Sequence, residues 1–346
     1  MIAAMLTVVL LSSSQPAMST LSPSPIVIAH RGASGERPEH TRAAYELAID
    51  QGADFIEPDL VMTRDGHLVV RHENEIGETT DVADRPEFAA RRTTRDVDGV
   101  PITGWFTEDF TLAELKTLRA RERLPALRPA SAAFDGREPI LTFDEVIVIA
   151  RDASARTGRV IGVAPELKHP SHFAALGLPM EDVFIAALER HGLTGAHSPI
   201  LIQCFEVGTL ERLAARIDAP LLQLMQAHGG PADRPGATYA EMATPHGLAE
   251  IARYAGYIGV QDLMVVPRDD AGRALEASAL IDNAHAAGLK VVVWTFRAEN
   301  VFLPAQYRVG DVSAAHGDFE GWLEAIYALG VDAVFSDFPA AAVDVR

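Results

Sequence analysis

Cysteine is nearly absent from the chain. Cys204 is the only one among 346 residues, which excludes an internal disulfide, a zinc site built from several cysteines and a lipid-modified cysteine near the N-terminus. We expect Cys204 to be a small core side chain. Because a chain of this length can bury a sizeable core, the cysteine count does not fix the cellular compartment.

Basic residues are also scarce. The chain has 30 Lys and Arg against 48 Asp and Glu, which gives a formal net charge of −18 at pH 7. A protein that binds nucleic acid needs a clustered basic face, so no nucleic-acid partner is expected. Net charge bears on solubility and association rather than on fold, and no feature of the sequence indicates an oligomeric state.

No apolar run is long enough to cross a bilayer as a helix, so stable membrane insertion is not expected. Residues 1–22 begin with a short apolar stretch followed by small and polar residues, which resembles a signal peptide. No Lys or Arg precedes His30, so the usual basic start is missing. We interpret 1–22 as a signal peptide, which predicts a periplasmic or secreted protein. The alternative is a disordered leader on a cytoplasmic protein.

From residue 23 to residue 346 the pattern is that of one domain in which short apolar runs alternate with amphipathic helical segments. Alternation of this kind predicts a parallel α/β sheet, and eight strands are the number that closes a TIM (β/α)₈ barrel. The eight predicted strands cover 26–30, 54–60, 160–167, 200–205, 220–225, 257–261, 290–296 and 332–338.

One stretch interrupts this alternation. An Asp-Gly turn at 65–66 lies between two short extended runs, which predicts a hairpin after the second strand. From about 75 to 138 the pattern is irregular, except for a helix expected over 111–120. Because this stretch is too long for an ordinary connection, we interpret it as an insertion. It follows the hairpin directly, so we expect it to cover the mouth of the barrel.

Carboxylates gather where two predicted strands end. Glu57 and Asp59 are two residues apart, so on a strand they face the same side, and Glu166 ends the next strand. Carboxylates held together repel unless a cation or a proton intervenes, and all-oxygen ligation suits Mg²⁺ or Ca²⁺. Ion pairing to Arg31 and Lys168 without a metal is the alternative.

Two histidines flank these carboxylates. His30 ends the first strand and His72 ends the returning arm of the hairpin, and a pair of histidines suits a reaction that needs one base and one acid near neutral pH. Arg31 and Lys168 add cations suited to an anionic substrate, most naturally a phosphate. Alone, either histidine would be interpreted as structural.

Three further residues near predicted strand ends have simpler interpretations. Phe205 and Trp294 are either barrel packing or the apolar wall of a pocket. His40 precedes an amphipathic run and is expected near a helix N-terminus.

Taken together, these segments resemble the glycerophosphodiester phosphodiesterases, and most closely the long bacterial periplasmic type. The resemblance runs from about Ile26 to the C-terminus. The matching segments are AHRGASGERPEHT (29–41), GADFIEPDLVMTRDGHLVVRHE (52–73), TDVADR (80–85), PELK (165–168), QCF (203–205) and FSDFP (335–339). The first two are specific when they occur together.

The resemblance implies a TIM barrel that binds a divalent cation, with Ca²⁺ expected and Mg²⁺ as the alternative. It implies that the metal ligands are Glu57, Asp59 and Glu166, that His30 and His72 are the acid/base pair, and that Arg31 contacts the phosphate beside Lys168. Gly32 would let the backbone approach the ligand. Glu73 stands where the family usually has Asp, which puts the orientation of His72 in question.

The activity implied is metal-dependent hydrolysis of small glycerophosphodiesters to sn-glycerol 3-phosphate and an alcohol. One alternative is a phospholipase D-like activity on lysolipids, which an open apolar groove beside the metal would favour. The other is a non-catalytic binding protein that retains the barrel, which loss of a histidine or a ligand would have suggested.

Overall fold

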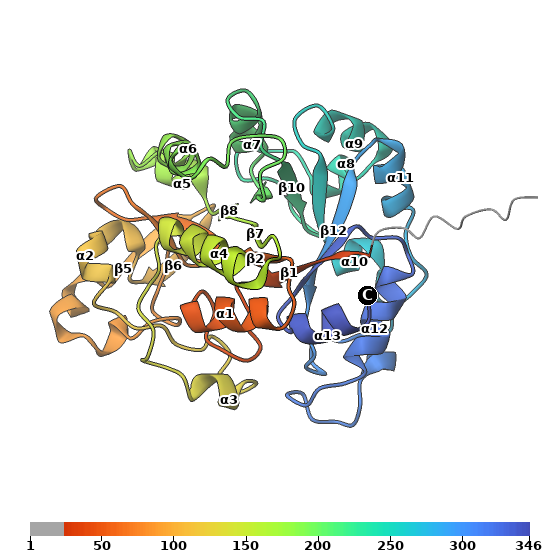
Figure 1. Cartoon of the computed structure of the whole chain (residues 1–346), viewed down its shortest axis with the longest axis horizontal. Helices are drawn as coiled ribbons and strands as arrows, with labels where there is room; N and C mark the ends of the chain where they lie inside the picture. The colour runs from red at the N-terminus through yellow and green to blue at the C-terminus, as the bar shows by residue number, and fades with distance from the viewer. Residues whose placement is uncertain (1–23) are drawn as a thin grey trace, which may run out of the picture.

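The computed structural model describes residues 24–346, in which a closed parallel barrel is surrounded by helices (Figure 1). The sheet has the order β4-β3-β8-β9-β10-β11-β12-β13-β1-β2-β7. The barrel closes because β1 pairs with β13 on one side and with β2 on the other. The strands are β1 (Ile26–His30), β2 (Phe55–Glu57), β3 (Asp59–Met62), β4 (Leu68–Val70), β7 (Gly162–Val163), β8 (Glu166–Leu167), β9 (Ile202–Cys204), β10 (Leu221–Met225), β11 (Tyr257–Gln261), β12 (Lys290–Phe296) and β13 (Ala333–Ser336).

Two of the eight predicted barrel strands are broken at a proline. Pro58 separates β2 from β3, and Pro165 precedes β8. Proline has no N–H to donate to the sheet, but its carbonyl still accepts: the backbone N–H of Glu166 donates to the carbonyl of Pro58 at 2.9 Å. Because β2 pairs with β7 and β3 pairs with β8, β2 and β3 together occupy one strand position of the barrel. In the same way, β7 and β8 together occupy the next position. The predicted eight-stranded TIM barrel is confirmed.

Helices cover the outside of this barrel, and their apolar faces follow the predicted amphipathic segments. Large residues of α1 and α4 pack against the strands, whereas a separate apolar cluster fills the barrel itself. The interior cluster consists of Ile28, Ala164, Leu201, Leu222, Leu224, Val292, Ala333 and Phe335. The helices are α1 (Arg42–Asp50), α4 (Phe143–Thr157), α5 (Pro170–Ala175), α6 (Met180–His191), α7 (Val207–Ala214), α8 (Tyr239–Met242), α9 (Pro245–Ile251), α10 (Asp262–Val265), α11 (Leu280–Ala286), α12 (Phe319–Tyr327) and α13 (Pro339–Asp344).

The hairpin predicted around Asp65-Gly66 is present, with β3 and β4 antiparallel. Between β4 and α4 lies the irregular stretch, which occupies the left side of Figure 1. Its elements are β5 (Thr93–Val97), β6 (Val100–Gly104), α2 (Leu112–Leu115), α3 (Pro129–Ala132) and three short 3₁₀ turns. The β5–β6 pair forms a separate two-stranded sheet.

The helix expected over 111–120 is shorter than predicted. Its start is as the sequence indicates, because Thr111 and Glu114 form a reciprocal capping box, but α2 ends at Leu115. The following residues are extended instead, since Arg119 bridges to Pro139 and Ala120 to Thr80. Pairing with distant segments therefore overrides the local helix pattern.

The interpretation of residues 1–22 as a leader falls outside the described residues. Among residues 24–346, no helix combines the length and the apolar character that a membrane span requires.

Candidate active site

Strand register gathers the predicted site residues at one end of the barrel. His30 is the neighbour of Glu57 across β1 and β2. In the adjoining strands, Glu166 lies between Asp59 and Gln203. Because the strands are parallel, the side chains that follow their C-terminal ends meet at the same mouth.

The three predicted ligand carboxylates converge there. One oxygen each from Glu57, Asp59 and Glu166 lie within 4.8 Å of one another, and all three side chains are buried. Oε2 of Glu57 accepts a 2.8 Å hydrogen bond from the backbone N–H of Arg31. Oδ2 of Asp59 lies 2.9 Å from Nε2 of His40, whereas its Oδ1 has no hydrogen-bond partner among the described residues.

The electrostatics of this triad fit a bound cation. Burial and then the neighbouring Asp59 raise the pKa of Glu57 well above its usual range. Burial raises the pKa of Glu166 to about 8, although Lys168 lowers it. Burial also acts to raise the pKa of Asp59, but positive charge around it holds that pKa well below its usual value. A buried carboxylate oxygen without a partner, among carboxylates that resist ionising together, is the donor set that a hard divalent cation takes.

Cations of the chain neutralise part of the same cluster. Nζ of Lys168 lies 2.8 Å from Oε1 of Glu166, and Nε of Arg31 lies 3.4 Å from Oδ2 of Asp59. These contacts match the ion-pairing alternative, but they leave Glu57 without a side-chain cation contact within 4 Å among residues 24–346. Two cations for three carboxylates leave room for a further positive charge.

His30 faces the pocket from the end of β1. Its Nδ1 lies 2.6 Å from Oδ1 of Asp337, the residue after β13. A carboxylate accepts, so Nδ1 carries the proton and Nε2 has its lone pair free; no partner of this Nε2 is found between residues 24 and 346. Burial, together with the charge of Arg31, lowers the pKa of His30 to about 4. The imidazole is therefore neutral near neutral pH, with the lone pair of Nε2 available to accept a proton.

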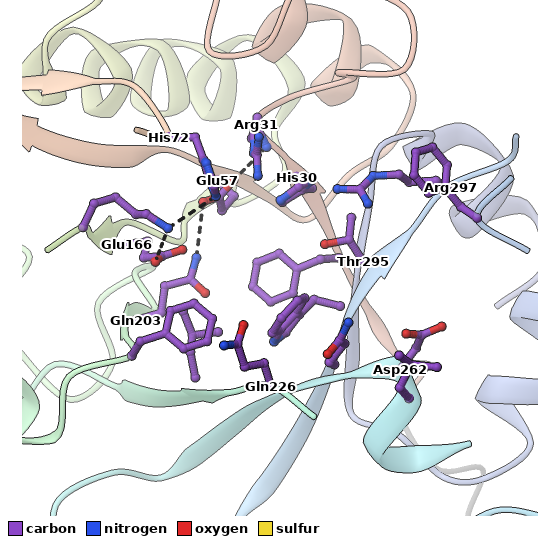
Figure 2. A pocket seen from close by; sticks show the side chains of 18 of the residues that line it. His30, Arg31, Glu57, His72, Glu166, Gln203, Gln226, Asp262, Thr295 and Arg297 are labelled. Carbon is purple, nitrogen blue, oxygen red and sulfur yellow. Dashed lines mark hydrogen bonds and ion pairs between the residues drawn. The ribbon is translucent and has the colours of Figure 1, made fainter. Parts of the chain in front are cut away.

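In Figure 2, His72 and His30 lie on either side of Glu57. Its Nδ1 is bound by a carboxylate oxygen of Glu73, and its Nε2 lies 3.3 Å from Nζ of Lys168. Burial, then Arg31 and Lys168, lower the pKa of His72 to about 3. Glu73 thus contacts the ring directly, so glutamate at this position can orient His72 although the family usually has aspartate there.

Arg31 and Gly32 turn the chain sharply after β1, with φ angles of 60° and 85°. A Cβ on Gly32 would lie 2.7 Å from the backbone of Ala44 in α1. The glycine therefore permits close packing of α1 against the turn, and the approach of the backbone to a ligand stays a prediction.

A pocket of about 530 Å³ opens over the triad, a volume typical of small-molecule sites. Arg31 and Lys168 line it with both histidines, and so do Phe205 and Trp294. The two aromatic rings meet edge to face at 5.8 Å, and the indole N–H of Trp294 is buried without a partner in the described part of the chain. The residues that also line the pocket include Gln226, Gln261, Asp262, Arg268, Arg297 and Phe302.

The irregular stretch does not cover the mouth as expected. Among residues 24–346, none of those lining the pocket comes from 75–138. Instead, the stretch approaches the site from behind the histidines, where Arg123 contacts Glu73 and Arg128 contacts Asp337.

Sequence reasoning missed several buried partners of the site. His40 does precede α1, but its ring is fully buried between Asp59 and Tyr45. The matching segment FSDFP contains Asp337 but does not indicate its contact with His30, and Arg123 and Arg128 lie in none of the matching segments. For His40 the signal was its place inside the segment AHRGASGERPEHT; the two arginines carry no local pattern.

This arrangement can now be compared with known proteins. The model of the "Glycerophosphoryl diester phosphodiesterase family" matches residues 30–341. The chain belongs to this family. As a glycerophosphodiester phosphodiesterase, it is a phosphoric diester hydrolase, which removes the non-catalytic alternative.

Relatives of the phosphodiesterase come from plants and bacteria. It is 38% identical to glycerophosphodiester phosphodiesterase GDPD6 of Arabidopsis thaliana, over 91% of this chain and 84% of the plant protein. It is 29% identical to a glycerophosphodiester phosphodiesterase of Haemophilus influenzae, over 75% of this chain and 74% of that one.

Solved structures share its fold. A glycerophosphodiester phosphodiesterase of Agrobacterium tumefaciens gives a TM-score of 0.57 at 20% identity, covering 93% of this chain and 100% of the other. A phosphodiesterase of Oleispira antarctica, in complex with the product sn-glycerol-3-phosphate, gives 0.59 at 22% identity, covering 93% and 96%.

Proposed function

We propose that this phosphodiesterase hydrolyses glycerophosphodiesters to sn-glycerol 3-phosphate and an alcohol, with a divalent cation at Glu57, Asp59 and Glu166 and with His30 and His72 as the acid/base pair. Ca²⁺ is the expected ion and Mg²⁺ the alternative. The observation that carries the proposal is the placement of two histidines, each anchored through Nδ1 to a carboxylate, beside a buried carboxylate triad.

The pocket supports an anionic substrate. Arg31 and Lys168 line it beside the triad, and a phosphodiester carries the negative charge that such cations bind. A bound cation would supply Lewis acidity, neutralising phosphate charge and lowering the pKa of a substrate hydroxyl. The product complex of the Oleispira antarctica enzyme supports sn-glycerol 3-phosphate as the released half.

The substrate contains its own nucleophile. The glycerol 2-hydroxyl is adjacent to the phosphorylated carbon and can close a five-membered cyclic phosphate, gaining the advantage of enforced proximity. We assign the base to His30, whose Nε2 is free to accept the hydroxyl proton while Asp337 holds Nδ1. As the new oxygen–phosphorus bond forms, the bond to the alcohol breaks.

We assign the acid to His72. Its Nε2 lies 3.3 Å from Nζ of Lys168 and must carry a proton before it can donate to the leaving alcohol. Negative charge on a bound phosphodiester would raise the pKa of a histidine that Arg31 and Lys168 lower in the free protein. Water then opens the cyclic phosphate with the two roles reversed.

Identification of the products tests this function. We expect glycerophosphocholine to yield sn-glycerol 3-phosphate and choline, measured by coupled glycerol 3-phosphate oxidation and by mass spectrometry. Release of phosphocholine and glycerol would contradict the proposal, because the other phosphate ester bond would then have broken.

We also propose that the protein is exported, on the signal-like pattern of residues 1–22. Expression of the full chain in a bacterial host, followed by N-terminal sequencing of the periplasmic fraction, tests this. Recovery of only the uncleaved chain in the cytoplasm would contradict it.

A further inference from the structure

Both histidines end a chain of contacts with the same two steps, from imidazole to carboxylate to arginine. On one side, Nδ1 of His72 is bound by Glu73, whose Oε2 lies 2.6 Å from a guanidinium nitrogen of Arg123. On the other side, Nδ1 of His30 is bound by Asp337, whose Oδ2 lies 2.7 Å from a guanidinium nitrogen of Arg128. The two arginines are five residues apart.

Arg123 and Arg128 are held in place by their own segment. The backbone N–H of Arg128 donates to the carbonyl of Leu124 at 2.8 Å, and Glu122 accepts a 2.8 Å hydrogen bond from the backbone of Leu124. Ser131 of α3 also contacts Glu122. A compact turn therefore fixes the backbone positions of the two arginines relative to each other.

Each arginine makes further contacts that restrict its position. Arg128 is 7% exposed, lies 2.5 Å from Oε1 of Glu299 and donates to the carbonyl of Ser34 at 3.0 Å. Arg123 also forms a two-point pair with Glu39, at 2.8 and 2.6 Å. Oε2 of Glu39 in turn accepts a 3.0 Å hydrogen bond from Arg31.

We propose that Arg123 and Arg128 are positioning residues for the acid/base pair, so that the turn 123–128 sets the orientation and tautomer of both histidines at once. The proposal rests on the roles assigned to His30 and His72 above. A carboxylate held by an arginine stays ionised and fixed, and a fixed carboxylate holds the imidazole proton on Nδ1 and aims Nε2 into the pocket.

The two arginines should differ kinetically. Arg128 reaches the site through Asp337, and it shares Oδ2 of Asp337 with Nε of Arg297, which lies 3.0 Å away. Because Arg297 keeps its contact, Arg128→Ala should lower kcat by about tenfold with little change in KM. Arg123 reaches both His72 and, through Glu39, the phosphate-binding Arg31. Arg123→Ala should therefore lower kcat and also raise KM. Arg128→Lys, which keeps the charge, should recover part of the kcat.

A matched control comes from the same irregular stretch. Arg91 makes a two-point pair with Glu114, at 3.0 and 2.5 Å, and its side chain is 28% exposed against 22% for Arg123. Arg91→Ala should keep the wild-type kcat and KM. The proposal would be overturned if Arg123→Ala and Arg128→Ala lowered kcat no more than Arg91→Ala does.

Histidine ¹⁵N spectra give a readout that does not depend on activity. In the wild type, His30 should show the tautomer protonated on Nδ1, with its signal assigned through His30→Gln. In Arg128→Ala, the signal should move towards the Nε2-protonated form, and free guanidinium ion should reverse the change. An unchanged tautomer in a folded Arg128→Ala variant would overturn the proposal, whereas a wild-type protein without hydrolase activity would instead overturn the assigned function.

Discussion

Nε2 of His40 lies 2.9 Å from Oδ2 of Asp59, and both side chains are almost completely buried beneath the pocket. Nδ1 of the same ring lies 2.9 Å from the hydroxyl of Tyr45. The ring therefore holds Oδ2 of Asp59, whereas Oδ1 has no hydrogen-bond partner among residues 24–346. His40, which has no exposed surface, thus restricts the orientation of a proposed ligand carboxylate.

The first prediction concerns His40. His40→Ala should weaken Ca²⁺ and Mg²⁺ binding about 10- to 100-fold, because an unsupported ligand carboxylate can rotate. Isothermal titration of the metal-free protein measures this. His285→Ala is the matched control, since His285 pairs with Asp332 at 2.9 Å near the surface and should leave metal affinity unchanged. Wild-type affinity in His40→Ala would show that Asp59 needs no such support.

Removal of divalent cations should abolish hydrolysis. The three carboxylates repel one another when all are ionised, so EDTA should inactivate the enzyme and added Ca²⁺ or Mg²⁺ should restore it. Thermal denaturation should show a higher Tm with the ion, since an ion that binds only the folded state stabilises it. Full activity after exhaustive chelation would contradict the metal site.

The route through a cyclic phosphate predicts that a 2-deoxy substrate analogue binds without being cleaved. His30→Ala and His72→Ala should each lose at least about 100-fold in kcat, in keeping with the loss of general acid–base catalysis, while circular dichroism shows a folded protein. Competition with glycerophosphocholine measures binding of the analogue. Cleavage of the 2-deoxy compound at a near-normal rate would favour direct attack by water.

Substrate size should matter, although the irregular stretch does not cover the pocket. The pocket of about 530 Å³ is lined largely by polar and charged side chains, with Phe205 and Trp294 as an aromatic wall. Glycerophosphocholine and glycerophosphoethanolamine should be hydrolysed, whereas diacyl phosphatidylcholine should not, because most of the side chains that line the pocket are polar or charged. Comparable turnover of the diacyl lipid, measured by choline release, would favour the phospholipase D-like alternative.

Stability should fall between about pH 4.5 and 7 through Glu206, whose carboxylate accepts hydrogen bonds from Ser171. Burial raises the pKa of Glu206 from 4.5 to about 7 despite these bonds. The folded protein then holds a proton that the unfolded chain has lost, so the free energy of unfolding decreases as pH rises through this window. Glu206→Gln should remove about 2 kcal/mol of that decrease. Urea titrations at pH 4.5 and 7.5 measure the free energy of unfolding of the wild type and of Glu206→Gln. An equal decrease of this free energy between the two pH values in both proteins would contradict the prediction.

The fold was predictable because apolar runs and amphipathic segments alternate, and this periodicity survives two broken strands. Glu57, Asp59 and Glu166 were predictable because they sit at strand ends, where barrel geometry brings side chains together. The partners of the histidines were not. Asp337 is 307 residues from His30, and Glu299 is 171 residues from Arg128, so only tertiary structure shows these contacts.

The helix expected over 111–120 is shorter than predicted for a related reason. Its start agrees with the sequence, because Thr111 and Glu114 form a capping box, but bridges to Thr80 and Pro139 determine how the backbone continues. Local signals set where the helix starts, and distant pairing sets where it ends.

Closure of the barrel by β1 and β13 has a consequence for the order of events during synthesis. A nascent chain emerges with its N-terminal part first, so His30 leaves the ribosome long before Asp337. Until β13 has been made, β1 lacks one neighbour and His30 lacks the carboxylate that holds its Nδ1. A growing chain can therefore carry all three acidic ligands and both histidines while its proposed base remains unanchored, and activity should arise only when the last strand joins the first.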